Sequence, residues 1–302
     1  MKRQKIKVKE KGRRVGFYPP LFTFYSSLSL FFALIFSVSA TAQKVAILAP
    51  GKQTVPEFVE KLAEEISKSV TVLDGSLSES AFNASNHIDP FNMTADESKS
   101  AGTAIGCDFF VLVRTETQRL ASLEHSELYV AHASIYVISS KTGHLIYWTN
   151  KSSQAVKSLV AEFHLPRSAI MISDELLELI TRSQKSEFNE SKPANIEELP
   201  IENSPASKNF RPPVPYRRIK PEYTQEAYLY TVTATVEILV DIDASGTITR
   251  TEIVRWAGFG LDESVEKAVR SMNWRPAERS GKPLPIRVLL RYNFKKTETK
   301  PS

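Results

Sequence analysis

The chain has 302 residues, enough for two domains and additional segments. Its net charge of +5 is unevenly distributed: residues 1–14 hold eight Lys/Arg and one Glu, whereas the rest holds 31 Lys/Arg and 33 Asp/Glu. The positive excess therefore belongs to the N-terminal end, which removes the electrostatic argument for nucleic-acid binding. Cys107 is the only cysteine, so an intramolecular disulfide is excluded.

The N-terminal segment has the composition of an export signal. Residues 15–43 contain no charged side chain, 28–38 are its most apolar part, and Ala40-Thr41-Ala42 resembles a signal-peptidase site. Residues 1–42 are therefore predicted to be a cleaved signal peptide. The same run is also long enough to stay in the inner membrane as a signal anchor. Both alternatives predict export to the periplasm, because the basic end stays in the cytoplasm.

Residues 43–184 alternate between strand and helix patterns, which predicts an α/β domain. A capping box at Thr54 and Glu57 predicts the start of a helix. The continuous apolar run at 109–113 predicts a buried strand, and small residues predict a helix over 94–105. Alternating residues over 127–138 and 144–149 predict a hairpin, and 166–182 a closing helix.

This order of elements, with glycine at 106 and the Lys141-Thr142-Gly143 turn, resembles the TolB N-terminal and CsgG-like periplasmic α/β domains. The resemblance implies a role in envelope assemblies rather than catalysis.

Residues 185–210 are rich in Lys, Glu, Ser, Asn and Pro, which predicts a flexible linker between two domains. At roughly 3.3 Å per residue, this linker reaches at most about 90 Å.

Residues 211–294 predict a small α+β domain, and 295–302 a tail. Apolar residues alternate along 232–241 and again along 286–294, as in strands with one buried face. Residues 247–256 predict the return strand of a hairpin, and a slip in parity between Ile248 and Ile253 predicts a bulge. The helical period of 261–272 completes a three-stranded antiparallel sheet with one helix.

The turn of this hairpin has a second interpretation. Counted from Asp241, acids at the first and third positions, Gly246 at the sixth and Glu252 at the twelfth follow a calcium-loop pattern. Such a loop needs helices on both sides, whereas the flanks are β-branched and alternating. The hairpin is therefore the favoured interpretation, and no metal is expected.

The C-terminal domain resembles the C-terminal domain of TonB-family energy transducers. The matching pieces are residues 240–246, 258–262, 268–270, 274–277 and 281–283, which occur in the family's order over about a quarter of the chain. The resemblance implies that a segment of an outer-membrane transporter pairs beside the final strand.

The expected partner-binding residues lie on that last strand, because a sheet covered by one helix leaves an edge exposed. They are Arg287, Val288, Leu289, Leu290, Arg291 and Tyr292. Arg287 and Arg291 are expected either to meet acidic residues near the partner or only to keep the edge soluble.

Two functional hypotheses remain. In the first, a TonB-like protein binds an outer-membrane transporter by strand addition and transduces proton-gradient energy from inner-membrane motor proteins. In the second, a cleaved periplasmic adaptor binds envelope proteins without energy coupling. The absence of histidine from residues 15–43 favours the second, since the family's membrane anchor usually holds one. A homodimer is a further possibility.

No catalytic set is visible in the sequence. The five histidines show no metal-ligand spacing, and nucleotide-binding and Ser-nucleophile motifs are absent. We expect no enzymatic activity and no cofactor.

Overall fold

The computed structural model describes residues 43–120, 127–187, 196–201 and 203–296. The predicted signal peptide or anchor, residues 1–42, lies outside these residues, as does most of the predicted tail. Within the described ranges, no helix combines the length and hydrophobicity needed to cross a membrane.

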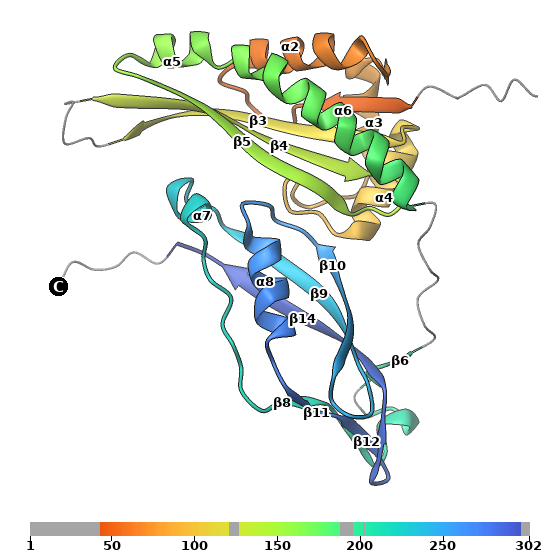
Figure 1. Cartoon of the computed structure of the whole chain (residues 1–302). Helices are drawn as coiled ribbons and strands as arrows, with labels where there is room; N and C mark the ends of the chain where they lie inside the picture. Colours follow the sequence, from red (N-terminus) through yellow and green to blue (C-terminus); the bar gives the residue numbers. More distant parts are fainter. Residues whose placement is uncertain (1–42, 121–126, 188–195, 202, 297–302) are drawn as a thin grey trace, which may run out of the picture. The chain divides into compact units, whose positions relative to one another are not determined.

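The N-terminal half contains a five-stranded sheet in the order β2-β1-β3-β4-β5 (Figure 1). Two parallel pairs join β2, β1 and β3, and antiparallel pairs join β3, β4 and β5. The strands are β1 (Lys44–Leu48), β2 (Thr71–Val72), β3 (Phe109–Leu120), β4 (Leu128–Ser139) and β5 (Leu145–Ala155). The sequence therefore predicted the hairpin of β4 and β5 but underestimated the length of β3.

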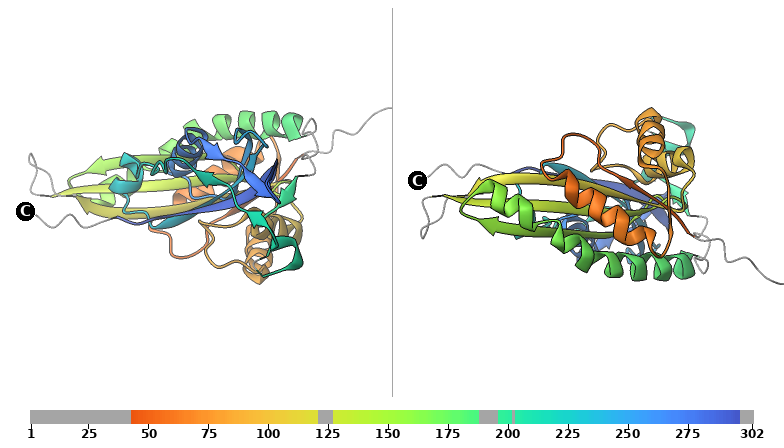
Figure 2. Two further views of the ribbon diagram at one scale, coloured as in Figure 1. Left: turned by 90° about the horizontal axis from the view of Figure 1, so that it is seen from below. Right: turned by 90° about the horizontal axis from the view of Figure 1, so that it is seen from above.

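Helices cover both faces of this sheet. On one face, α2 (Pro56–Ser67), α5 (Ser158–His164) and α6 (Arg167–Glu187) lie over the strands, as the right view of Figure 2 shows. On the other face, α3 (Gly75–Ala84) and α4 (Ala95–Ile105) bury Phe82 and Ala101 against β1 and β3.

The helix predicted over 94–105 is present as α4, whereas the start signal predicted for α2 is wrong. Thr94 and Glu97 form a capping box at α4, which ends at Gly106 with φ of 77°. The capping box predicted at Thr54 is wrong: α2 begins at Pro56 after Val55, without a side-chain cap. Thr54 instead donates its backbone N–H to the Thr115 carbonyl on β3, at 3.2 Å.

The C-terminal half contains a second sheet in the order β10-β9-β14-β6. Its elements are β9 (Ala234–Ile242), β10 (Ile248–Arg255), α8 (Leu261–Arg270), β14 (Ile286–Phe294) and β6 (Glu197–Glu198). β9 is the centre of an antiparallel three-strand unit, and register shifts in β10 after Ile248 and Ile253 confirm the predicted irregularity.

The prediction of only three strands is wrong, because β6 adds a short fourth strand. Glu197 and Glu198 pair in parallel with Ile286 and Arg287, and Glu197 Oε2 accepts a hydrogen bond of 3.0 Å from Arg279. Part of the predicted linker is thus regular structure: it also contains the 3-10 turn η1 (Pro205–Ser207) and the first residue of β7 (Phe210–Arg211).

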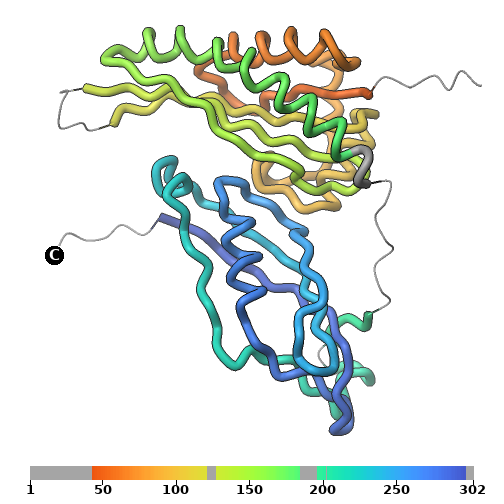
Figure 3. Tube along the Cα trace, viewed as in Figure 1, coloured from red at the N-terminus to blue at the C-terminus, as the bar shows by residue number. Residues whose placement is uncertain are grey.

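Short elements complete this half. β8 (Val214–Pro215) pairs with β11 (Trp274–Arg275), and β7 pairs with β12 (Ala277–Arg279), which pairs with β13 (Lys282–Leu284). The helix α7 (Gln225–Leu229) begins after Thr224, whose hydroxyl accepts the Ala227 N–H. The chain from β8 to α7, teal in Figure 3, passes along the outer side of β14.

The two sheets share one hydrophobic core. Phe110, Leu112 and Tyr136 from the first sheet belong to the same cluster of buried residues as Val236 and Ile238 from the second. Aromatic rings join the two parts: the centroids of Tyr136 and Trp256 are 5.6 Å apart, and those of Trp148 and Phe259 are 4.5 Å apart. The composition of residues 185–210 predicted a flexible connection and carried no signal of this shared core.

Candidate functional site

The outer edge of β14 is the first candidate binding site. One edge of β14 pairs with β9 without interruption from Ile286 to Phe294. The other edge pairs with β6 only at Ile286 and Arg287. Among the described residues, no further strand pairs with residues 288–294 on this side. Unpaired backbone groups on a sheet edge can accept an added strand.

All six residues expected to bind a partner lie on β14, and they alternate between two faces. Val288, Leu290 and Tyr292 belong to or pack against the core beneath α8. The other three are Arg287, Leu289 and Arg291. Leu289, which lies between Arg287 and Arg291 on the same face of the strand, is 49% exposed.

The two arginines have partners inside the chain. Arg287 donates from Nε and Nη2 to Asp241 at 2.6 and 2.8 Å, and Arg291 Nε donates to Glu237 at 2.6 Å. Both acceptors lie directly opposite on β9 and are buried. The hydrogen bonds to Asp241 raise the pKa of Arg287. These contacts give the arginines a structural role, and only Arg291, with 63% of its side chain exposed, also presents a cation to solvent.

A groove of about 320 Å³ lies beside this edge. Leu290, Arg291 and Tyr292 line one side, and the other lining residues are Pro213, Pro215, Arg218, Ile219, Met272 and Trp274. Trp274 is only 5% exposed, and its indole N–H has no acceptor among the described residues. A buried donor without a partner is energetically costly, so this indole N–H is an unusual feature of the wall of the groove.

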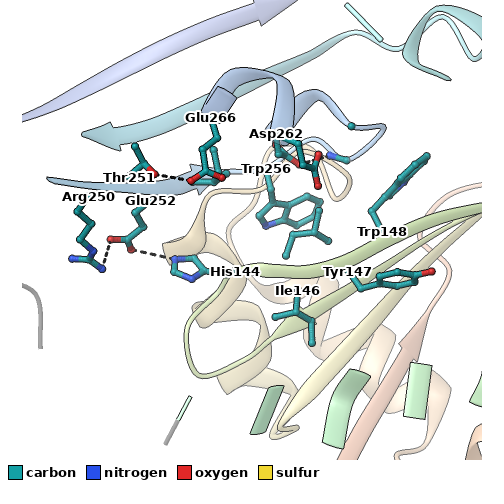
Figure 4. A pocket seen from close by; sticks show the side chains of 15 residues that line it. His144, Ile146, Tyr147, Trp148, Arg250, Thr251, Glu252, Trp256, Asp262 and Glu266 are labelled. Carbon is teal, nitrogen blue, oxygen red and sulfur yellow. Dashed lines mark hydrogen bonds and ion pairs between the residues drawn. The ribbon is translucent and has the colours of Figure 1, made fainter. Parts of the chain in front are cut away.

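A second pocket, of about 610 Å³, lies between β5, β10 and the start of α8 (Figure 4). In it, Glu252 contacts His144 Nε2 at 3.1 Å and Arg250 Nη2 at 2.9 Å. Glu266 accepts a hydrogen bond of 2.7 Å from Thr251. No local sequence pattern pointed to this pocket, because its residues come from segments more than 100 positions apart.

Asp262 is the most buried acid of this second pocket. Its carboxyl accepts the backbone N–H groups of Ala257 and Gly258, at 2.9 and 2.7 Å. Burial raises the pKa of Asp262 to about 7, although these two hydrogen bonds favour the charged form. The sequence pattern placed this residue in the predicted helix over 261–272 and indicated nothing of its burial.

The turn between β9 and β10 confirms the hairpin interpretation over the calcium loop. Asp243 Oδ1 accepts the backbone N–H groups of Ser245 and Thr247, at 2.8 and 2.9 Å. Gly246 has a φ of 87°, as such a turn requires. In the described ranges, no three His, Cys, Asp or Glu side chains are grouped so as to hold a metal ion.

The comparisons with known proteins agree with the second half of the fold. The sequence model of a family described as Gram-negative bacterial TonB protein C-terminal matches residues 219–295. This match covers the strands β9, β10 and β14 and the helix α8, and therefore the free edge described above. The chain thus carries a C-terminal domain of the TonB family, which suggests a TonB-like envelope protein.

Several solved structures resemble parts of the chain at low identity. The TonB C-terminal domain of Pseudomonas aeruginosa is 18% identical with a TM-score of 0.26, and the match covers 36% of this chain and 100% of that one. A hypothetical protein from Chlamydia trachomatis is 10% identical (TM-score 0.29; 43% and 94% covered). A lipoprotein from Neisseria meningitidis is 12% identical (TM-score 0.28; 44% and 99% covered). No curated protein sequence matches this chain.

Proposed function

We propose that this chain is an exported protein of the bacterial envelope that binds an outer-membrane transporter by β-strand addition to β14. The observation that carries the proposal is the outer edge of residues 288–294, which no other described strand pairs with, within a TonB-type domain. An extended segment of the transporter would pair with this edge. Its side chains would enter the groove lined by Leu290, Tyr292 and Trp274.

The proposal assigns binding, and no catalysis or cofactor, to this edge. Backbone pairing would supply affinity that depends little on the partner's sequence, whereas the groove would select side chains. Leu289 supports this function, because a half-exposed leucine on an edge strand provides apolar area for a partner to cover.

We further propose energy transduction. In this mechanism, residues 1–42 stay in the inner membrane, and motor proteins there use the proton gradient to pull, through this chain, on the bound transporter. The alternative is a cleaved periplasmic adaptor without energy coupling. One observation favours the adaptor: the TonB-type domain shares a core with the α/β domain, so the two domains form one folded unit.

In-cell photo-crosslinking tests the proposal. A photoreactive amino acid at position 289 is expected to crosslink outer-membrane transporters, whereas the same group at the exposed Leu77 on α3 is not. Equal crosslinking from both positions, or crosslinks from 289 only to a second copy of the chain, would overturn it. Crosslinks only to a second copy would mean that this edge forms a homodimer.

A protonophore, which dissipates the proton gradient, distinguishes energy transduction from the adaptor function. If the protein transduces energy, dissipating the proton gradient changes the yield of crosslinks from position 289. An adaptor gives the same yield with and without the gradient.

A further inference from the structure

The short strand β6 occupies one end of the edge to which the partner segment is proposed to add. The strand order places β6 on the side of β14 away from β9, where Glu197 and Glu198 pair in parallel with Ile286 and Arg287. This is the same side on which no other described strand pairs with residues 288–294. One position beside a sheet edge holds only one strand, so a partner that paired with the whole length of β14 would need the place of β6.

Among the described residues, few interactions hold β6 at this edge. Its backbone pairs with only two residues of β14. Both of its side chains are exposed, so its departure would bring no buried apolar side chain of β6 into water. Two residues further on, Pro200 has no backbone N–H to donate to a longer ladder. The strand can therefore leave β14 without disturbing the core.

One pair of side chains fastens β6 to the rest of the domain. Arg279 on β12 donates from Nη1 to Glu197 Oε2 at 3.0 Å and from Nη2 to Glu197 Oε1. Two parallel hydrogen bonds give this pair a defined geometry. The Arg279 and Glu197 side chains are 36% and 42% exposed, so water and salt weaken the attraction between them. The fastening is thus specific in its partners but weak.

We propose that β6 is an intramolecular competitor for the outer edge of β14, and that a partner segment displaces it on binding. With β6 in place, the open edge comprises residues 288–294. With β6 released, it begins at Ile286, and the partner can form two more residue pairs. The fraction of molecules in which β6 is released would then set the apparent affinity for such a partner. This inference rests on the proposed strand addition and adds its regulation.

The test measures the yield of transporter crosslinks from a photoreactive amino acid at position 289 of the full-length chain. Glu197→Arg places two cations together and is expected to release β6, which raises the yield about two- to fivefold. The charge-swapped variant Glu197→Arg/Arg279→Glu restores the pair and is expected to return the yield to that of the wild type. The matched control is Glu60→Arg on the exposed side of α2, which is expected to change nothing.

Hydrogen exchange of the purified full-length chain shows whether β6 has left the edge. Faster exchange in residues 286–288 is expected for Glu197→Arg and not for the charge-swapped variant. The double variant Glu197→Pro/Glu198→Pro is a second means of release, because proline removes both N–H groups of β6. It is expected to raise both the exchange rate and the crosslink yield.

Faster exchange in residues 286–288 without a higher crosslink yield would overturn the competition by β6 and leave strand addition in place. Unchanged exchange in both release variants would also overturn it, because β6 would then not protect this edge. If neither the wild type nor any released variant crosslinks a transporter from position 289, the strand addition itself is wrong.

Discussion

The Asn92 side chain forms hydrogen bonds with both the N–H and the carbonyl of Thr235, which lies 143 residues further along the chain. Its Oδ1 accepts the Thr235 N–H at 3.0 Å, and its Nδ2 donates to the Thr235 carbonyl at 2.8 Å. The same Nδ2 donates to the Trp256 carbonyl at 2.6 Å. One side chain from the α/β half thus forms hydrogen bonds with backbone groups at the start of β9 and just after the end of β10.

Asn92→Ala is expected to destabilise the junction of the two halves by about 1–3 kcal/mol, because it leaves partly buried backbone groups without partners. Thermal unfolding measures the loss, and faster hydrogen exchange at Thr235 locates it. Asn83→Ala, at an exposed position of α3, is the control and is expected to change little. An equal loss in both variants would contradict the role of Asn92.

Arg287→Ala is expected to cost more stability than Arg291→Ala. Removing Arg287 strips the partner from Asp241, which is 2% exposed, at a cost of about 3 kcal/mol or more. Removing Arg291 leaves Glu237 with Arg255 at 3.4 Å, so about 1 kcal/mol is expected. Chemical denaturation compares the two, and Asp241→Leu combined with Arg287→Leu should recover much of the loss. The reverse order of the single variants would contradict the pairing.

Gly258→Ala is expected to disturb the contact between β5 and the second sheet. Gly258 has a φ of 71°, and a Cβ there would lie 2.6 Å from Trp148 Cδ1. Gly281→Ala is the control, because its φ of 78° carries the same backbone strain but nothing lies within 4 Å of the added carbon. A lower melting temperature and altered tryptophan fluorescence are expected for Gly258→Ala relative to Gly281→Ala. Identical behaviour would mean that Trp148 moves aside without cost.

Asp262 is expected to make stability depend on pH between about 4 and 7. Burial raises its pKa from 3.8 to about 7, so the folded chain holds this proton more tightly than the unfolded chain. The contribution is complete below pH 3.8 and is lost as the pH rises to about 7. Melting temperatures of Asp262→Asn across this range should lack that decline.

Titration of His132 changes stability with pH in the opposite direction, so its effect must be separated from that of Asp262. Burial lowers its pKa from 6.5 to about 4, so its contribution is present above pH 6.5 and is lost as the pH falls to about 4. The difference between wild type and Asp262→Asn cancels this term. A difference that does not vary with pH would contradict the raised pKa of Asp262.

Local patterns in the sequence were sufficient to predict the elements around β9, β10, α8 and β14. Alternation and helical period depend on neighbours a few residues apart, so they predicted even the irregularity of β10. The pairing of β6 was not predictable in this way, because two glutamates in a polar stretch carry no strand signal. These glutamates instead pair with the backbone at the start of β14, and Glu197 also contacts Arg279.

The candidate site was predictable only in part for the same reason. Edge position follows from strand order, so β14 could be named in advance. The partners of Arg287 and Arg291 depend on register, which places Asp241 and Glu237 directly opposite them. The second pocket and the shared core depend on contacts between distant segments, such as Trp148 with Phe259, and no local pattern encodes these.

The uninterrupted ladder between β14 and β9 has a mechanical consequence. A partner strand that pulls along the axis of β14 would load this ladder in shear, so that all nine residue pairs from Ile286 to Phe294 resist together. β10 meets β9 with two breaks in register, and the same pull there would open the ladder piece by piece. Of the two edges of this sheet, β14 is therefore the one suited to transmit tension.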